Sequence, residues 1–344
     1  MKTQAVVFAE AGQARLQELT LDALGPRDIA VRTLVTAISP GTERWVLKGK
    51  HIGTAFPCVP GYHRIGIVEQ CGGAVAALHP GDLVYGTGNR WAEAVRSMWG
   101  AHCGYSVGPA EAYKFLSAAP PDPVELETTV FTMGAAVAYR GVQALDPKPG
   151  DALLIIGGGF IGLCAAQLAV RRGARPLVMD NDPEKVAFAG RLGVAAVDAA
   201  DPGFEAALKA HAPAGFDQVY DSAGVPDAID RAVAQARRRG TLLLQAQYFD
   251  KEHRAIDLDQ IKIKEMTVRT TCGVPGPDWD ATLDLIRRRR LNVAPLITHR
   301  FGSGRALDGY KLLLDGQPFN LGIVFCWDQA LLAGGYFQSR LTAG

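Results

Sequence analysis

Three glycines in one short stretch have the spacing of a dinucleotide-binding turn. Gly157, Gly159 and Gly162 follow the apolar run 152–156, so the segment predicts a buried strand, a turn and a helix over roughly 160–172. In this G-x-G-x-x-G pattern the first glycine allows the tight turn, the second lets the backbone approach a pyrophosphate, and the third lets the helix pack on the strand. The N–H groups at the helix start would face that phosphate. The predicted cofactor-binding residues of the turn are Gly157, Gly159, Phe160, Ile161 and Gly162.

A carboxylate stands at the end of the next predicted strand. The apolar run 176–179 ends in Asp180, 23 residues after Gly157. A carboxylate at this place can accept hydrogen bonds from both ribose hydroxyls of an adenosine and would repel a 2′-phosphate. The predicted cofactor is therefore NAD. The alternative is a strand–helix–strand unit that binds no ligand.

The composition is that of a globular protein without a charge bias. The chain has 344 residues, 48% hydrophobic and 21% charged, with a net charge of +1. This balance favours neither nucleic acid nor an anionic membrane as a partner and leaves a small-molecule substrate. No apolar run reaches the ~20 residues that span a bilayer. The N-terminus does not have the shape of a signal peptide.

The cysteines are scattered and form no C-x-x-C pair. This spacing argues against a disulfide framework and against a structural zinc site. We therefore expect a reduced, cytoplasmic protein. The six positions are Cys58, Cys71, Cys103, Cys164, Cys272 and Cys326.

The elements that must position these residues change character along the chain. Residues 1–115 are rich in strand signals, and a helical segment is expected at about 124–144. From Asp151 onward strands alternate with helices, which is typical of a parallel sheet with crossovers. The expected strands are 5–8, 29–35, 66–69, 82–85, 218–221, 240–245 and 266–271, followed by helices at 281–289 and 306–314 and a strand at 322–325.

The order of the elements predicts an α/β protein with one domain inserted in another. A Rossmann-type parallel-sheet domain, residues 126–274, interrupts a β-rich catalytic domain made of residues 1–125 and 275–344. We expect the last strand to return to the first domain. Ligands of such sheets bind outside the carboxyl ends of the strands, so the cleft between the domains is the expected active site.

Three motifs in the first domain carry a family resemblance. They are Ile38-Ser39-Pro40-Gly41-Thr42-Glu43, Pro60-Gly61-Tyr62-His63-Arg64-Ile65-Gly66 and Pro80-Gly81-Asp82-Leu83-Val84. With the glycine turn and Asp180, they resemble the medium-chain dehydrogenase/reductase superfamily, in its alcohol dehydrogenase-like group, over nearly the whole chain. The Ser-x-Gly-Thr-Glu and Pro-Gly-Tyr patterns are similar to a zinc-free branch around bacteriochlorophyllide 3-hydroxyethyl dehydrogenase. The resemblance implies a GroES-like catalytic domain and a homodimer formed through the edge strand 266–271.

The zinc ligands of this superfamily are missing at the matching positions. Its zinc enzymes carry a Cys in the segment that matches 38–43, Gly-His-Glu where this chain has Gly61-Tyr62-His63, and a third ligand near 131–133. This chain offers Ser39 or Pro40, Tyr62 and Met133 instead. A catalytic zinc needs about three ligands from Cys, His, Asp and Glu. Possible ligands elsewhere are Glu43, His63 and His102. We predict no bound metal.

Without zinc, side chains must move a proton and stabilise charge on the substrate oxygen. His63 is the first candidate, because an ordinary pKa near 6.5 suits proton transfer around neutrality. Tyr62 replaces a zinc ligand, so its hydroxyl could donate to that oxygen. Glu43, if an apolar cleft raises its pKa, and Thr42 come next. The alternative roles are structural: a backbone-bonded His63, a space-filling Tyr62, and Glu43 in the first turn of a helix capped by Thr42 or Ser39.

Further candidates lie in a long irregular segment and at two strand ends. Loops on a rigid scaffold often carry specificity, so the segment predicts a substrate wall, although an ordinary packed loop is as plausible. The wall residues are Arg90, Trp91, Trp99 and His102. In the resembled fold, the ends of strands 218–221 and 240–245 face the cofactor crevice. They contribute Ser222, Ala223 and Gln245.

These residues together predict a zinc-independent, NAD(H)-dependent oxidoreductase that interconverts an alcohol and a ketone or aldehyde. One alternative is an enoyl or quinone reductase, which such zinc-free enzymes often are, usually with NADPH. Asp180 argues against NADPH. The other alternative is a dinucleotide-binding sensor without turnover, because the catalytic residues are poorly defined by the sequence.

Overall fold

The computed structural model describes residues 1–118, 122–253, 255–315 and 319–342. The chain forms two compact units, Met1–Phe131 with Ala294–Gly344, and Thr132–Val293. The second unit is thus inserted between two parts of the first. No helix in the described ranges has the length and apolarity that crossing a bilayer requires.

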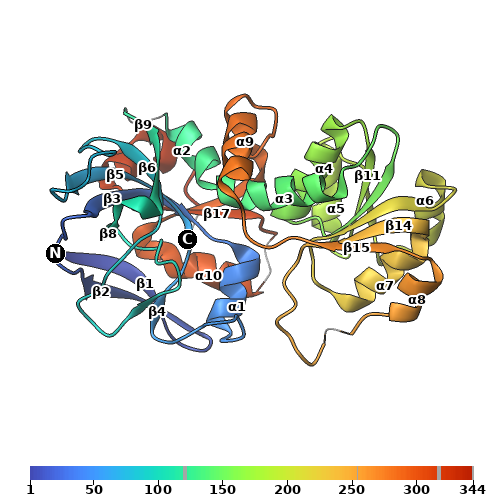
Figure 1. The fold of residues 1–344 in the computed structure, drawn as a ribbon, viewed down its shortest axis with the longest axis horizontal. Coiled ribbons are helices and arrows are strands. Elements are labelled where there is room, and N and C mark those ends of the chain that lie inside the picture. The colour runs from blue at the N-terminus through green and yellow to red at the C-terminus, as the bar shows by residue number, and fades with distance from the viewer. Residues whose placement is uncertain (119–121, 254, 316–318, 343–344) are drawn as a thin grey trace. The chain divides into compact units, whose positions relative to one another are not determined.

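The first unit is built on two sheets (Figure 1). The larger sheet has the order β16-β17-β3-β5-β6-β9, with β8 also paired to β3, and the smaller has the order β2-β1-β4-β7. The strands are β1 (Lys2–Glu10), β2 (Gln13–Thr20), β3 (Asp28–Ala37), β4 (Cys58–Val59), β5 (His63–Cys71), β6 (Leu83–Gly86), β7 (Arg96–Ser97), β8 (Tyr105–Pro109), β9 (Tyr113–Ser117), β16 (Ile297–Gly302) and β17 (Gly322–Cys326). The helices are α1 (Pro40–Leu47), α2 (Pro123–Val130), α10 (Ala306–Asp315), α11 (Gln329–Ala333) and α12 (Gly335–Gln338).

The return of the last strand to the first unit is confirmed. Strand β17 pairs antiparallel with β3, where Val324 lies opposite Ala37. Its five residues are all buried, and Phe325 packs with Phe8 and Tyr310 in a core between the sheets, α1 and α10. The C-terminal part therefore completes the sheet that carries the candidate catalytic segment.

The second unit is a parallel six-stranded sheet flanked by helices (Figure 1). Its order is β12-β11-β10-β13-β14-β15, and every adjacent pair runs parallel. Strand β10 is buried along its whole length, as expected of a central strand covered on both faces. The strands are β10 (Ala152–Ile156), β11 (Arg175–Asp180), β12 (Ala196–Asp198), β13 (Phe216–Asp221), β14 (Ala236–Leu244) and β15 (Thr267–Thr270). The helices are α3 (Thr132–Leu145), α4 (Phe160–Arg171), α5 (Pro183–Arg191), α6 (Phe204–His211), α7 (Pro226–Gln235), α8 (Leu258–Ile263) and α9 (Gly276–Arg287).

The predicted fold class is confirmed, while two details differ. The helix expected at 124–144 is interrupted at Phe131, whose N–H bonds to the carbonyl of Thr128 in a tight final turn of α2. Helix α9 packs on α3 and so belongs to the second unit. The division therefore lies at 131/132 and 293/294, and not at 125/126 and 274/275. All six cysteines are free.

Candidate functional site

The glycine turn between β10 and α4 has the geometry that its spacing predicts. Gly157 has φ +99°, in the left-handed region that favours glycine. A Cβ on Gly162 would lie 1.9 Å from the carbonyl oxygen of Gly157, so only glycine fits there. A Cβ on Gly159 would meet nothing within 4 Å, which leaves open space before the first turn of α4. The residues present therefore fit a bound pyrophosphate at this helix start.

Asp180, at the end of β11, is tied to the glycine turn. Its Oδ2 accepts from the N–H of Gly158 at 2.7 Å, and its Oδ1 accepts from the N–H of Asp182 at 2.9 Å. The Nζ of Lys185 lies 3.9 Å from Oδ2. This lysine offsets part of the negative charge of the carboxylate. The sequence analysis missed Lys185, although a basic residue in the first turn of the next helix was a usable signal.

The end of β13 contributes to the same turn. The Ser222 hydroxyl donates to the carbonyl of Ile156 at 2.7 Å, and a Cβ on Gly157 would lie 3.2 Å from Cβ of Ala223. The neighbouring Asp221 is buried, which raises the pKa of its carboxyl, and it accepts from the Tyr248 hydroxyl. Sequence reasoning missed Tyr248, which no motif marks.

The side chain of Gln245 contacts other groups than the predicted cofactor crevice. Its Oε1 accepts a hydrogen bond from the Thr271 hydroxyl, and a Cβ on Gly141 of α3 would lie 2.8 Å from it. The side chain is thus directed to α3 and to the segment after β15. The structure brings Ser222 and Ala223 to the glycine turn and gives the Gln245 side chain other partners.

Three hydroxyls meet in the first unit. The Tyr62 hydroxyl is hydrogen-bonded to the Ser39 hydroxyl and lies 3.4 Å from Thr42 Oγ1. Ser39 is the N-cap residue of α1, and Thr42 is in its first turn, so the helix start fixes both. Burial raises the pKa of Tyr62, which keeps its hydroxyl protonated. We call Ser39, Thr42 and Tyr62 the hydroxyl cluster.

His63 is placed unfavourably for the role predicted for it. The side chain is 2% exposed, and its Nδ1 lies 3.1 Å from the Tyr85 hydroxyl. Burial, helped by the electrostatic effect of the neighbouring His102, lowers the pKa of His63 to about 3. A histidine with this pKa carries no proton to give near neutrality. The geometry therefore favours Tyr62 over His63 as the proton-donating side chain.

Glu43 and His102 form a fully buried pair. Glu43 Oε2 lies 3.0 Å from His102 Nε2 and accepts from the Tyr310 hydroxyl at 2.5 Å, while Oε1 accepts from the N–H of Ser39 at 2.7 Å. The other ring nitrogen of His102 lies 2.8 Å from Thr36 Oγ1. With these partners Glu43 has a structural role. His102 has no exposed surface, so it cannot form the predicted substrate wall.

The buried pair also supports the turn that carries Tyr62. Gly61 has φ +91°, and a Cβ there would lie 2.4 Å from the ring of His102. The pair thus contacts both segments of the hydroxyl cluster, through Ser39 and through Gly61. We regard Glu43 and His102 as positioning residues.

Of the other wall residues, one lies at the hydroxyl cluster. The ring of Trp99 packs edge-on against Tyr62, with centroids 5.3 Å apart. Arg90 instead pairs with Asp28, and Trp91 packs with a separate apolar cluster at the end of β2. The contacts of Arg90 and Trp91 give no support to a role in substrate binding.

The positions that match the zinc ligands do not fit a zinc ion. Ser39 and Tyr62 offer neutral hydroxyls, and Met133 in α3 offers a thioether, where zinc takes thiolate, imidazole or carboxylate. The raised pKa of Tyr62 also opposes the phenolate that a metal would need.

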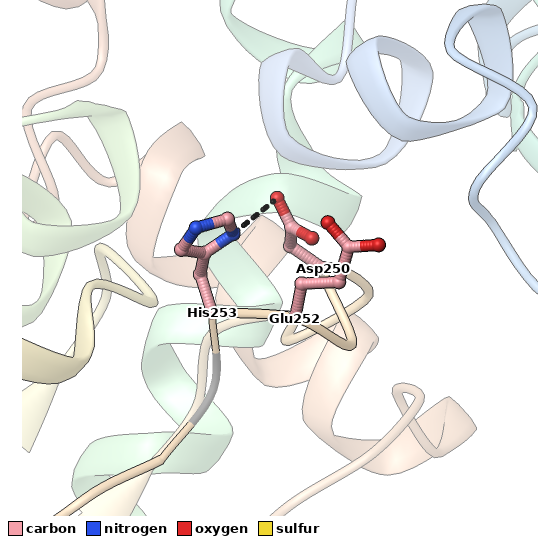
Figure 2. A group of neighbouring side chains, drawn as sticks. All are labelled: Asp250, Glu252 and His253. Carbon is pink, nitrogen blue, oxygen red and sulfur yellow. Dashed lines mark ion pairs between the residues drawn. The ribbon is translucent and has the colours of Figure 1, made fainter.

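One other group of possible metal ligands stands out in the described ranges. The ligand atoms of Asp250, Glu252 and His253 lie within 4.8 Å of one another, and His253 Nδ1 is 3.6 Å from Asp250 Oδ2 (Figure 2). Glu252 and His253 are exposed and lie on the segment between β14 and α8. Exposed acidic side chains often lie this close together in a solvated turn without binding an ion. We therefore assign no metal to this group.

Comparisons with known proteins agree with both units. The family described as alcohol dehydrogenase GroES-like domain matches residues 25–119, and the family described as zinc-binding dehydrogenase matches residues 161–288. The chain is 28% identical to 2-desacetyl-2-hydroxyethyl bacteriochlorophyllide A dehydrogenase of Cereibacter sphaeroides, covering 95% of this chain and 99% of the relative.

Solved structures share the whole fold. A zinc-binding dehydrogenase of Sinorhizobium meliloti bound to NADP has a TM-score of 0.77 at 23% identity, covering 95% of this chain and 99% of that one. An alcohol dehydrogenase of Escherichia coli complexed with NADH has a TM-score of 0.79 at 18% identity, covering 94% and 99%. The two cofactors differ by the 2′-phosphate, so the fold by itself is compatible with either.

Proposed function

Because this chain belongs to the medium-chain dehydrogenase/reductase superfamily, in its alcohol dehydrogenase-like group, and is thus an oxidoreductase, we propose that it interconverts an alcohol and a ketone or aldehyde with NAD and without zinc. The observation that carries the proposal is the hydroxyl cluster. In it the tyrosine that, by the motif resemblance, matches a zinc ligand is protonated and bonded to a second hydroxyl.

The second unit would hold the cofactor. The N–H groups at the start of α4 bind the pyrophosphate, with Gly159 leaving the space and Gly162 keeping α4 against β10. Asp180 would accept hydrogen bonds from the adenosine ribose, and Lys185 Nζ lies 3.9 Å from its Oδ2. When bound, the dinucleotide supplies or accepts the hydride at its nicotinamide ring.

NAD is the proposed choice over NADP because of the charge of Asp180. A 2′-phosphate beside the carboxylate would meet like charge in a half-buried site, which is strongly unfavourable. Lys185, 3.9 Å from the carboxylate, reduces that repulsion without removing it. We therefore propose a preference for NAD that is finite and depends on Asp180.

The hydroxyl cluster would handle the proton. In carbonyl reduction Tyr62 donates a hydrogen bond to the substrate oxygen and transfers its proton as that oxygen gains charge. The Ser39 hydroxyl, bonded to Tyr62, passes its own proton to the tyrosine and takes one from solvent water in the same event, so that neither hydroxyl is left deprotonated, and Thr42 offers a second hydroxyl at 3.4 Å. In alcohol oxidation the same proton leaves the substrate in the opposite direction.

The decisive variant is Tyr62→Phe, which removes one hydroxyl and keeps the ring against Trp99. General acid–base groups contribute roughly 10²–10⁴-fold, so turnover should fall by about that factor. The affinity for NAD, measured by titration, should stay unchanged because the second unit supplies the cofactor site. Tyr105→Phe is the matched control, since Tyr105 lies on β8 and makes no side-chain contact with the cluster in the described structure. Near-normal turnover of Tyr62→Phe would remove Tyr62 from the mechanism.

The same experiment addresses the related reaction on C=C bonds. An enoyl or quinone reductase would also use a proton donor, so the substrate panel must include enones and quinones beside ketones. The proposal requires turnover of alcohols or ketones with NAD(H). Turnover of enones alone would replace it with the reductase, and cofactor binding without any turnover would leave a dinucleotide sensor.

We also propose a homodimer formed through strand β15. The strand is the edge of the parallel sheet, and all four of its residues are exposed (Figure 1). An open edge presents unpaired N–H and C=O groups that a second copy can satisfy. Light scattering after size exclusion should give twice the chain mass, and Val268→Pro should give the single mass.

A further inference from the structure

Trp99 has a strained backbone. Its φ of +69° lies in the left-handed region, which a bulky side chain rarely adopts, and the side chain is 38% exposed. Such a conformation persists only where the surroundings impose it, and it concentrates at ligand-binding positions. The ring does not escape into solvent, because it packs edge-on against Tyr62 and against His51, with centroids 5.3 and 5.5 Å away.

Two buried donors hold this strained segment. The carbonyl oxygen of Gly100, the next residue, accepts hydrogen bonds from Arg64 Nη1 and Asn89 Nδ2. Arg64 is completely buried, and its remaining donors reach the carbonyl of Gly86 at 3.1 Å and the Tyr113 hydroxyl at 2.5 Å. No carboxylate in the described ranges pairs with this guanidinium. A buried charge without a counter-ion is costly, so its presence here implies that fixing these carbonyls matters.

The segment that is held this way forms one wall of a hollow in the first unit. The hollow measures about 540 Å³, and no Asp, Glu, Lys or Arg side chain lines it. Five apolar side chains line it, namely Ile52, Met98, Trp99, Pro109 and Ala112, together with the uncharged polar side chains of Thr87, Asn89 and Ser97 and the imidazole of His51. Asn89 lies in the lining, and its Nδ2 is used to hold the carbonyl of Gly100.

We infer that this hollow binds an uncharged ring of the substrate, with Trp99 as the specificity-determining wall. The inference rests on the proposed function, since it names the class of alcohol: one whose carbinol carbon bears an aryl or alicyclic group. The substrate oxygen reaches the Tyr62 hydroxyl while the ring packs against the indole that contacts the same tyrosine. A phosphate ester or an amino acid would find no Asp, Glu, Lys or Arg side chain in this lining to pair with its charge.

The variant that isolates the ring is Trp99→Gly, because glycine adopts the left-handed conformation without strain and so keeps the fold. Two quantities are compared with the wild type: the ratio of kcat/KM for 1-phenylethanol to that for 2-butanol with NAD, and the binding of acetophenone without cofactor, followed by ligand-observed NMR. The wild type should favour 1-phenylethanol at least tenfold. The ratio should fall about tenfold in Trp99→Gly, in keeping with the loss of an aromatic contact and its buried area.

Trp99→Phe, which keeps a smaller ring, should retain part of the preference. Phe115→Leu, which changes an exposed ring on β9 that does not line the hollow, should retain all of it. Equal kcat/KM for both alcohols in the wild type, with acetophenone binding unchanged in Trp99→Gly, would overturn the ring site and leave the proposed function standing. Acetophenone binding that depends on Trp99, without oxidation of any alcohol, would uphold the ring site and overturn the proposed function.

Discussion

Buried His63 should lower the free energy of unfolding in acid. Replacing His63 with a residue that does not titrate should remove this effect. The folded protein keeps the ring neutral, because burial and the electrostatic effect of His102 lower its pKa from 6.5 to about 3. The unfolded chain binds the proton more readily, so protonation favours unfolding. The contribution of the neutral His63 ring to the free energy of unfolding is fully present above pH 6.5. It is lost as the pH falls toward the pKa that His63 has in the folded protein.

The magnitude follows from the size of the shift. Below pH 6.5 the contribution falls by about 1.4 kcal/mol per pH unit, which amounts to about 2 kcal/mol at pH 5. His63→Asn keeps a polar atom near the position of Nδ1, which faces the Tyr85 hydroxyl, and removes the titration. The difference in free energy of unfolding between the wild type and His63→Asn should therefore shrink by about 2 kcal/mol from pH 7.5 to pH 5.

Urea unfolding at several pH values measures this difference. Gln13→Asn is the control, since Gln13 is exposed on β2 and neither side chain carries a titratable group. Its difference from the wild type should not change over the same range. A gap for His63→Asn that stays constant with pH would show that the folded protein does not lower the pKa of His63. It would also restore His63 as a group able to carry a proton in the folded protein.

Three further outcomes follow from the two sites. Asp180→Ala should narrow the ratio of NADP to NAD dissociation constants, measured by fluorescence titration, whereas an unchanged ratio would show that the carboxylate does not choose the cofactor. Gly162→Ala should abolish NAD binding in calorimetry, because its Cβ would lie 1.9 Å from the Gly157 carbonyl; retained affinity would contradict the tight turn. Glu43→Leu should lower the free energy of unfolding by roughly 3–5 kcal/mol, because it removes the acceptor of the Ser39 N–H and the Tyr310 hydroxyl and the partner of His102 Nε2, all of them buried; a loss below about 1 kcal/mol would contradict the positioning role.

The sequence predicts those parts of the molecule whose interacting residues lie close together along the chain. The glycine turn and Asp180 fall within one strand–helix–strand unit, where spacing alone decides which groups meet. Strand β17 was predictable because its apolar run had no place in the parallel sheet. Helix α9 was assigned to the wrong unit. The pattern of an amphipathic helix does not indicate which surface its apolar face packs against, and here that surface is α3.

The candidate catalytic residues show where sequence reasoning ends. Tyr62 and Thr42 were predicted from their motifs, but their proximity to Ser39 depends on how β4 and α1 are packed. His63 looked suitable because its type suits proton transfer, whereas burial, which a motif does not report, decides its pKa. Arg64 was read as one residue of a motif, because nothing local marks an arginine that will be buried without a carboxylate.

The most direct test of the proposed reaction follows the hydride itself. The protein is incubated with NAD and with 1-phenylethanol, 2-butanol or benzyl alcohol that carries deuterium on the carbinol carbon. Mass spectrometry then measures the label in the reduced cofactor. The account predicts one deuterium in each NADH formed with at least one of these alcohols, and a rate that falls by about 10²–10⁴-fold in Tyr62→Phe. Reduced cofactor without deuterium, or no reduction with any of the three, would contradict it.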